Sequence, residues 1–231
     1  MYTEQVTFSQ GSRSRLTAYD EARFPGDTLF DRLARAVCTA GCLPRKELYE
    51  AWEVARRTRR LFRGGRVVDL GGGHGLLAYL MLILDDSSAG AIVVDKAPSA
   101  CGAALAGALE QTWPRVSGRV ELVRDDIDHV ALAATDVVVA SHACGRLTDA
   151  VIDRAVTAGA RLAVLPCCHD LAACDAAGLE GWMEPALAID AARALGLKAR
   201  GYRIWTLAIP EEITPKNRLL LAAPSSGVPT G

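Results

Sequence analysis

The sequence predicts an α/β fold, with a mostly parallel, doubly wound sheet flanked by helices and preceded by an N-terminal helical extension. Three observations predict it. Short β-branched or apolar runs alternate with helical patterns from residue 66 onward. The first run ends in a cluster of glycines that leads directly into an apolar helix. Half of the 231 residues are apolar, which suits one large core.

The predicted extension covers residues 1–63, and the predicted core domain covers residues 64–231. Residues 1–27 show no sustained periodicity, so we expect a flexible arm or a lid there. One helix is expected to start near Thr28, and a second after Pro44, which suits a first helical position. Apolar residues recur at helical spacing in both, at Leu29, Leu33, Ala36 and Val37 and at Leu48, Ala51, Trp52 and Ala55.

The core domain is expected to contain seven strands joined mostly by helices. The strands are predicted at residues 66–70, 91–95, 119–124, 136–141, 161–166, 199–209 and 218–223. Helices are predicted directly after the glycine cluster and at residues 98–112, 147–158 and 185–195. Residues 225–231 are expected to form a frayed tail.

Charge and cysteine usage exclude some broad classes of protein. The formal net charge of −1 gives no global reason to expect a polyanionic partner, so a bulk nucleic-acid binder is not indicated. The seven cysteines are odd in number and irregularly spaced, and we expect reduced thiols. The longest apolar run, at residues 76–84, is far shorter than a membrane span. No membrane partner is therefore expected, and the expected location is the cytoplasm.

A glycine-rich motif follows the first core strand. Asp69, Gly71, Gly73 and Gly75 form the pattern DxGxGxG immediately before a helix. Glycines let the chain turn sharply and let a ligand approach the backbone, and the start of the following helix offers free amide groups. The motif predicts a site for a ligand that contains a nucleoside, although an ordinary turn between a strand and a helix has a similar composition.

Acidic residues also end the second and third predicted strands. Asp95, followed by Lys96, is placed to accept hydrogen bonds from ribose hydroxyls. Asp126 is placed to accept a hydrogen bond from the exocyclic amine of adenine, while Ile127 packs on the adenine ring. An aspartate at such a position can instead cap the following helix. Ser141, at the end of the fourth strand, completes the predicted cofactor-binding set.

These successive motifs resemble those of class I S-adenosylmethionine-dependent methyltransferases, over about residues 66–223. The resemblance implies a Rossmann-like catalytic domain with a seven-stranded sheet whose last strand is inserted antiparallel. It implies S-adenosyl-L-methionine as cofactor and S-adenosyl-L-homocysteine as product. The competing interpretation, an NAD-binding enzyme, fits less well because Leu76 stands where the last glycine of GxGxxG would be.

The fourth and fifth strands end in unusual polar segments. Residues 141–145 read SHACG and residues 166–170 read PCCHD, which places two of the four histidines on one rim. The pair resembles a methyltransferase branch that includes tRNA acceptor-stem 2′-O-methyltransferases and uncharacterised bacterial relatives. The resemblance suggests that His142 and His169 lie near the substrate.

Several chemistries are compatible with this rim. If the acceptor is protonated, His169 is the first candidate for the general base and His142 the second, although either imidazole can instead bind a loop carbonyl. Candidate ligands for a zinc ion would be Cys144, Cys167, Cys168, His142 and His169. Zinc is a weaker interpretation, because two of the cysteines are adjacent and no CxxC is present. We therefore predict no metal. A catalytic cysteine ranks below the histidines.

The leading hypothesis is a methyltransferase acting on a small molecule, such as a natural-product precursor, with the extension covering the pocket. The second hypothesis is a tRNA or rRNA methyltransferase guided by the arginines between residues 56 and 63, although these also suit a solvated helix face. Two further hypotheses are non-standard sulfonium chemistry, such as cyclisation, and a non-catalytic partner subunit. The polar segment 211–218, between the last two strands, is a candidate substrate loop.

Overall fold

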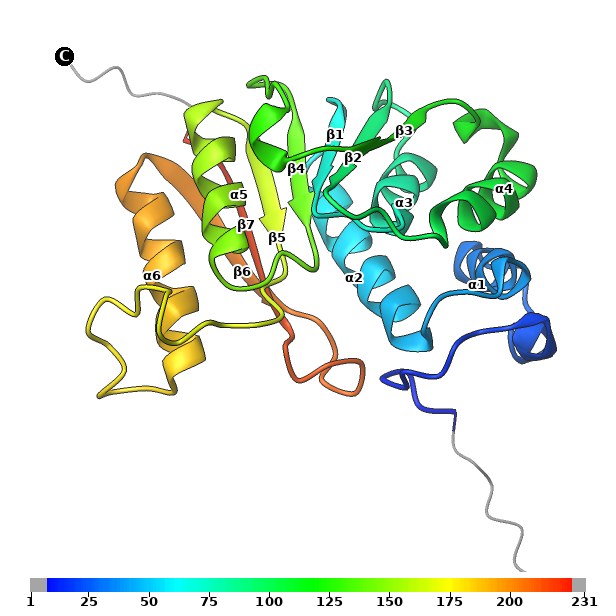
Figure 1. The fold of residues 1–231 in the computed structure, drawn as a ribbon, viewed down its shortest axis with the longest axis horizontal. Coiled ribbons are helices and arrows are strands. Elements are labelled where there is room, and N and C mark those ends of the chain that lie inside the picture. The colour runs from blue at the N-terminus through cyan, green and yellow to red at the C-terminus, as the bar shows by residue number, and fades with distance from the viewer. Residues whose placement is uncertain (1–7, 226–231) are drawn as a thin grey trace, which may run out of the picture.

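A seven-stranded sheet with the order β3-β2-β1-β4-β5-β7-β6 forms the centre of the molecule (Figure 1). The computed structural model describes residues 8–225, so the predictions for residues 1–7 and 226–231 lie outside it. The strands are β1 (Val67–Leu70), β2 (Ala91–Asp95), β3 (Val120–Arg124), β4 (Val137–Ala140), β5 (Arg161–Val164), β6 (Tyr202–Ala208) and β7 (Arg218–Pro224). The four pairs among the first five strands are parallel, and β7 runs antiparallel to both of its neighbours. The predicted fold class is confirmed.

Each face of the sheet is covered by helices. Alternate residues of one strand point to opposite faces, so Val67 belongs to one buried cluster and Val68 to the other. The first cluster also contains residues of α1 (Leu29–Ala40), α2 (Arg45–Leu61), α3 (Leu76–Leu84) and α4 (Gly102–Thr112). The second contains residues of α5 (Arg146–Thr157) and α6 (Pro185–Ala199). Burial between two helical layers explains why the central strands β1 and β4 are mostly apolar, whereas the edge strands β3 and β6 are partly exposed and carry charged residues.

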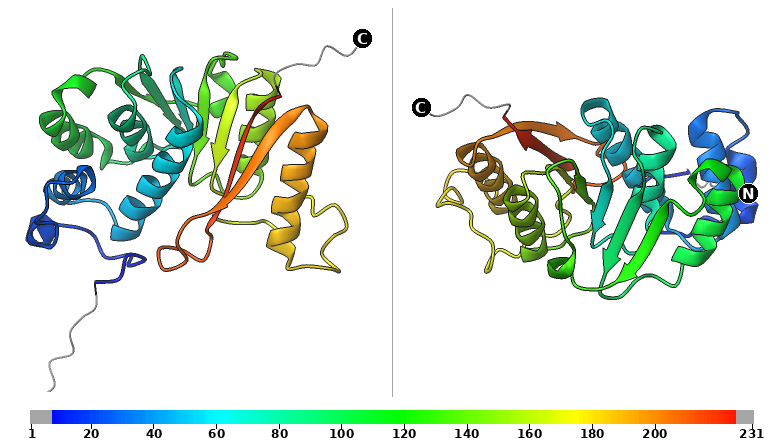
Figure 2. Two further views of the ribbon diagram at one scale, coloured as in Figure 1. Left: turned by 180° about the vertical axis from the view of Figure 1, so that it is seen from behind. Right: turned by 90° about the horizontal axis from the view of Figure 1, so that it is seen from above.

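The extension packs on the sheet through the first of these helical layers. Thr28 caps α1 by accepting a hydrogen bond from the amide of Asp31, and Gly41 ends the helix at φ +68°. Helix α1 packs on α4, and α2 packs on α3. Figure 2 shows both extension helices beside α3 and α4, away from α5 and α6. The extension and the core domain therefore share one hydrophobic core.

The described part of the N-terminal arm is packed rather than loose. Leu16 and Phe24 are buried, and the amide of Leu16 donates to the carbonyl of Leu43. A short 3-10 helix, η1 (Ala18–Arg23), lies between them. The sequence pattern did not predict this order because two buried side chains, separated by polar residues, leave no periodicity to detect.

The longest apolar run forms α3, which lies inside the molecule. Its side chains from Leu76 to Ile83 are all buried. Among residues 8–225, no helix is long and apolar enough to cross a membrane. Most boundaries lie within two residues of the prediction, and three differ by more. Helix α4 begins only at Gly102, α6 continues to Ala199 and β6 begins only at Tyr202.

Two cysteines form a disulfide, which the expectation of seven reduced thiols missed. Cys42 follows α1 and Cys101 precedes α4, and the packing of α1 on α4 brings their Cα atoms to 5.7 Å. That separation lies within the normal range for a disulfide. The residues are 59 positions apart in the sequence, so only the helix packing reveals the pair.

Candidate active site

The glycine motif forms a tight loop between β1 and α3. Gly71, Gly73 and Gly75 have φ values of +73°, +54° and +80°, which other residues rarely adopt. A Cβ atom added at Gly73 would meet no atom within 4 Å, so this side of the loop faces open space. The amides of the three motif glycines and of Leu76 each donate to a group within the protein, so the loop offers a ligand close approach to its backbone rather than free amides.

Asp69 lies directly beneath this loop. It is 1% exposed, and neither carboxylate oxygen has a hydrogen-bond partner among the described residues. Burial, with a smaller contribution from the charge of Asp95, raises the pKa of Asp69 to about 7. A Cβ atom at Gly72 would lie 2.5 Å from the Asp69 carboxyl carbon, so the loop can close over this side chain only with glycine there. A buried carboxylate of this kind favours a cationic ligand.

Asp95 is fixed by the same loop. Its carboxylate accepts hydrogen bonds from the amides of Gly73, at 3.0 Å, and Ala97, at 2.8 Å. These bonds hold the carboxylate at the end of β2, and each oxygen keeps a lone pair for a hydroxyl group. The geometry therefore suits the ribose site that the sequence predicts.

The remaining predicted cofactor-binding residues contact other parts of the protein. Lys96 and Asp126 form an ion pair with each other at 2.7 Å, and Asp126 also caps the short helix η3 (Ile127–His129). Ile127 is buried in the core against the sheet, and Ser141 is half-buried at the end of β4. Asp126 therefore has the capping role that the sequence left as an alternative. One carboxylate oxygen of Asp126 caps the helix, and the other is paired with Lys96.

A pocket of about 440 Å³ opens at the carboxyl-terminal rim of the sheet. Its wall includes the N-terminal segment, the start of α2, the ends of β4 and β5, and the loop between β6 and β7. The lining residues are Arg13, Pro44, Lys46, Glu47, His142, Cys167, Cys168, Thr214, Pro215 and Lys216. The predicted substrate loop therefore does line a pocket, and so does the extension. We call this cavity the rim pocket.

The two candidate histidines occupy different environments. His142 lines the rim pocket, and its Nε2 lies 3.9 Å from the buried carboxylate of Glu50 on α2. The side chain of His169 is only 2% exposed, and its Nε2 lies 2.7 Å from Asp190 on α6. The structure brings His142 to the pocket and turns His169 toward α6.

Asp190 holds His169 within a polar network. Arg218 donates to one Asp190 oxygen at 2.7 Å, and Arg193 donates at 3.3 Å to the oxygen that His169 contacts. Arg193 also pairs with Asp149 of α5 at 2.7 Å. This network joins the loop after β5 to α5, α6 and β7, so His169 contributes to the packing of that loop.

The glycine loop is tied to the extension by a contact that the sequence did not reveal. His74 Nδ1 accepts a hydrogen bond from the amide of Leu76 at 3.1 Å, so Nε2 carries the proton and donates to Glu47 at 2.8 Å. Burial alone would raise the pKa of Glu47, but the hydrogen bond from His74, with nearby positive charge such as that of Lys46, outweighs it and lowers that pKa. Glu47 also lines the rim pocket, so one side chain contacts both parts of the site.

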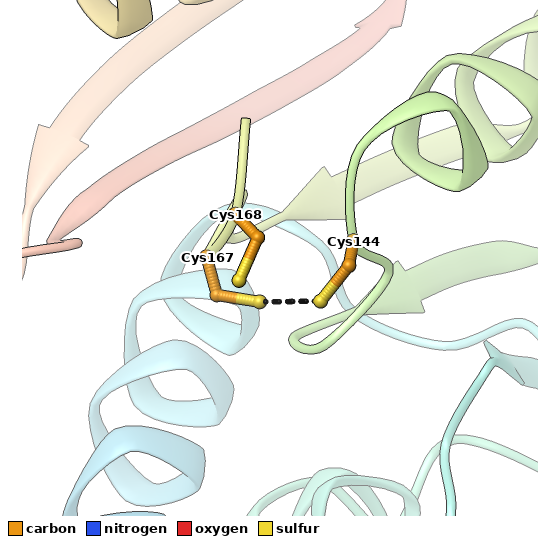
Figure 3. A group of neighbouring side chains, drawn as sticks. All are labelled: Cys144, Cys167 and Cys168. Carbon is orange, nitrogen blue, oxygen red and sulfur yellow. Dashed lines mark hydrogen bonds between the residues drawn. The ribbon is translucent and has the colours of Figure 1, made fainter. Parts of the chain in front are cut away.

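Three cysteines gather beside the rim pocket. The sulfurs of Cys144, Cys167 and Cys168 lie within 4.8 Å of one another, and those of Cys144 and Cys167 are 3.1 Å apart (Figure 3). Cys144 and Cys168 are exposed, and Cys167 is half-buried. Burial and the two neighbouring cysteines raise the pKa of Cys167 above its ordinary value.

The arginines of α2 are largely engaged in contacts within the protein. Arg59 is 2% exposed, donates to the carbonyl of Met81 at 2.9 Å and lies 3.2 Å from Asp85. Arg56 and Arg57 both pair with Glu53, one turn earlier. These three arginines therefore stabilise the packing of α2 and do not form a free basic surface.

Residues 46–175 match the family described as the methyltransferase domain. The chain belongs to this family. The family match and the fold identify it as a class I S-adenosylmethionine-dependent methyltransferase domain, and the match includes the glycine loop and both cysteine segments. No curated protein sequence matches the chain.

Solved structures share the fold of this methyltransferase domain at low sequence identity. An O-methyltransferase family protein from Burkholderia thailandensis has a TM-score of 0.53 and 21% identity, covering 94% of this chain and 66% of its own. The m1A22 tRNA methyltransferase of B. subtilis has a TM-score of 0.51 and 14% identity, covering 75% of this chain and 66% of its own. The magnesium protoporphyrin IX methyltransferase of Synechocystis, solved with S-adenosylhomocysteine, has a TM-score of 0.50 and 17% identity, covering 90% of this chain and 94% of its own. The chain spans just under two thirds of the length of the first two proteins.

Proposed function

We propose that this methyltransferase domain transfers a methyl group from S-adenosylmethionine to a small molecule. The observation that carries the proposal is the position of the rim pocket, which shares Glu47 with the contact to the glycine loop. Its volume of about 440 Å³ is in the range of small-molecule sites. The extension forms part of its wall, as a cover over a small acceptor would.

The residues of the glycine loop fit the proposed cofactor. The buried, unpaired carboxylate of Asp69 and the open side of Gly73 suit a cationic ligand that approaches the backbone closely. Asp95 is oriented to accept hydrogen bonds from the ribose hydroxyls. When bound, S-adenosylmethionine supplies an electrophilic methyl group and leaves as S-adenosylhomocysteine.

The protein then has to orient the acceptor, exclude water and accept a proton where the acceptor carries one. His142 is placed for the proton transfer because it lines the rim pocket, whereas His169 is held by Asp190. We therefore place His142 before His169 as general base. The carboxylate of Glu50, which is paired with Lys46, lies 3.9 Å from His142 Nε2 and places a negative charge near this imidazole.

The pocket lining also indicates the chemistry of the acceptor. Arg13 and Lys216 contribute positive charge, which favours an acceptor with an anionic group, whereas Lys46 is already paired with the buried Glu50 at 2.5 Å. A natural-product precursor with a carboxylate or an acidic hydroxyl group is consistent with this lining. A tRNA or rRNA acceptor has less support, because Arg56, Arg57 and Arg59 are already paired.

The proposed function is tested first by calorimetric titration with S-adenosylmethionine and S-adenosylhomocysteine, with NAD as the control. We expect micromolar affinity for the first two ligands and none for NAD. A screen of small acceptors with labelled methyl donor follows, with total tRNA and rRNA as separate arms. Preferential binding of NAD would refute the cofactor assignment, and methylation of RNA with strong salt dependence would favour an RNA acceptor.

A further inference from the structure

The ends of β4 and β5 bring three thiol groups to one point on the rim. Cys144 lies four residues after the end of β4, and Cys167 and Cys168 follow the end of β5. The two strands are parallel neighbours, so their carboxyl ends meet at the same edge of the sheet. Figure 3 shows the three sulfurs converging from these two loops.

Adjacent cysteines argued against a metal site in the sequence, and the structure removes that objection. Side chains of neighbouring residues point to opposite sides in a strand, but β5 ends at Val164. In the loop that follows, Cys167 and Cys168 both direct their sulfurs toward Cys144. The two residues can therefore bind the same ion.

The spacing of the sulfurs fits a tetrahedral zinc ion. With zinc–sulfur bonds of about 2.3 Å, two thiolates at tetrahedral positions lie about 3.8 Å apart. The sulfurs of Cys144 and Cys167 are 3.1 Å apart, and no pair of the three sulfurs exceeds 4.8 Å. Adjustments of each separation by no more than about 1 Å would therefore complete the tetrahedral geometry.

The two loops are held together independently of the cysteine side chains. The amide of Gly145 donates to the carbonyl of Cys168 at 2.9 Å. Gly145 has φ +57°, which favours glycine, and Arg193 donates to its carbonyl at 3.1 Å. The backbone thus presents the three sulfurs as a preformed site, which lowers the free-energy cost of ordering metal ligands.

We propose that Cys144, Cys167 and Cys168 bind one zinc ion whose fourth coordination position opens into the rim pocket. Thiolate ligands favour zinc among the common divalent ions, and three protein ligands with an open position are typical of catalytic rather than structural zinc. Cys167 and Cys168 line the rim pocket, so a ligand in that pocket lies beside the ion. Water or the anionic heteroatom of the acceptor, such as a thiolate, would occupy the open position. The role of the acceptor rests on the proposed function, whereas metal binding does not.

The first test measures metal binding alone. The full chain is purified with a non-thiol reductant and without chelator, its zinc content is measured, and the metal-free protein is titrated with Co²⁺. We expect one metal per chain and a thiolate-to-cobalt charge-transfer absorption band. No uptake of metal by a protein whose free thiols have been counted chemically would overturn the proposal, as would an oxidised Cys144–Cys167 pair that persists under reductant.

Serine variants at each ligand identify the site. Loss of a residue that only supports a metal ligand typically weakens metal binding by about 10 to 100-fold. We expect a larger loss of metal affinity in each of the variants Cys144→Ser, Cys167→Ser and Cys168→Ser. Cys174→Ser is the matched control, because Cys174 is a free cysteine in the same loop region outside the cluster. Unchanged metal affinity in all three ligand variants would overturn the assignment.

A second measurement tests the open position and separates this inference from the proposed function. Adding a small thiol to the Co²⁺ protein should shift its visible spectrum, because an accessible fourth position exchanges its ligand. An unchanged spectrum would indicate a closed site and would overturn the open-position assignment. Titration of the same samples with S-adenosylhomocysteine shows separately whether the cofactor site is intact, so failure of one proposal is not mistaken for failure of the other.

Discussion

His74 Nε2 donates a hydrogen bond to Glu47 Oε2 at 2.8 Å, and this contact links the cofactor loop to the N-terminal extension. His74 belongs to the glycine loop, and Glu47 lies in the first turn of α2 and lines the rim pocket. A ligand that moves the glycine loop must therefore also act on the pocket wall. This contact provides a physical route by which the cofactor could affect acceptor binding.

Replacing Glu47 with Gln should weaken this link. The substitution keeps the size of the side chain but removes a charged acceptor, so we expect unfolding free energy to fall by about 1 kcal/mol at pH 7. Denaturant titration measures this change, and calorimetry with S-adenosylhomocysteine measures whether cofactor affinity falls with it. Unaltered stability and S-adenosylhomocysteine affinity would show that the contact between His74 and Glu47 does not couple the glycine loop to the extension.

The effect of Glu47→Gln should depend on pH in a definite direction. The folded-state pKa of Glu47 is lower than its ordinary value of 4.5, so its contribution to stability is present above pH 4.5 and is lost as the pH falls through the folded-state pKa. The stability difference between wild type and variant should narrow at acidic pH. A difference that grows on acidification would contradict the assigned role.

Asp69→Asn should separate folding from cofactor binding. The folded-state pKa is about 7, above the ordinary 3.8, so the folded protein retains a proton that the unfolded chain releases. Wild-type stability therefore loses the Asp69 contribution as pH rises from 3.8 to about 7, and the variant should gain stability relative to wild type over that range. We expect affinity for S-adenosylmethionine to fall by about 10 to 100-fold, because a charged acceptor is lost. Equal affinity in calorimetry would remove Asp69 from the site.

Two neighbouring arginines of α2 provide a matched test of the structural role assigned to the buried one. Arg59→Ala removes a buried partner of Asp85 and of the Met81 carbonyl, while Asp85 keeps its hydrogen bonds from Gly64 and Ser87 and its ion pair with Arg63. We therefore expect the unfolding free energy to fall by about 1 to 3 kcal/mol. Arg60→Ala, at an exposed position, should change it by less than about 0.5 kcal/mol. Thermal and denaturant unfolding measure both. Loss of RNA binding without loss of stability in Arg59→Ala would reverse this interpretation.

The two candidate histidines should differ in their effects. His142→Ala should slow methyl transfer by about 10² to 10⁴-fold and leave cofactor affinity unchanged, as expected for a proton acceptor in the pocket. His169→Ala should instead lower unfolding free energy by about 1 to 3 kcal/mol, because it removes a partner of Asp190. Single-turnover rates and unfolding curves on both variants distinguish the roles. A large loss of rate with full stability in His169→Ala would restore it as the first candidate for the base.

Gly11→Ala should loosen the N-terminal side of the rim pocket. A Cβ atom at Gly11 would lie 2.7 Å from the carbonyl oxygen of Glu212 and 2.9 Å from that of Ile213, in the loop between β6 and β7. We expect a higher KM for the acceptor at unchanged cofactor affinity. Gly107→Ala in α4 is the control, since its Cβ would meet nothing within 4 Å and should stabilise the helix by up to about 1 kcal/mol. An unchanged KM for Gly11→Ala would exclude the N-terminal segment as a cover.

Local patterns in the chain were enough to predict the sheet, the glycine loop and the position of the rim. Runs rich in apolar residues between turn residues predicted all seven strands. Burial on both faces requires such runs in the central strands β1 and β4, whereas the edge strands β3 and β6 are partly exposed. Asp69 and Asp95 could be placed because residues at the ends of adjacent parallel strands meet at one edge. The same argument predicted that the segments after β4 and β5 would lie together.

Which side chains meet, in contrast, depends on the packing of the whole molecule. The pairing of His74 with Glu47 and the disulfide between Cys42 and Cys101 join segments that no local pattern connects. The segments of the three rim cysteines could be placed together, but only the packing of their loops turns the sulfurs toward one another. The direction of His169 toward Asp190 was equally hidden, because a loop residue has no periodicity that fixes its side chain. Local pattern reports which face of an element is buried, whereas contacts between loops depend on how whole elements pack.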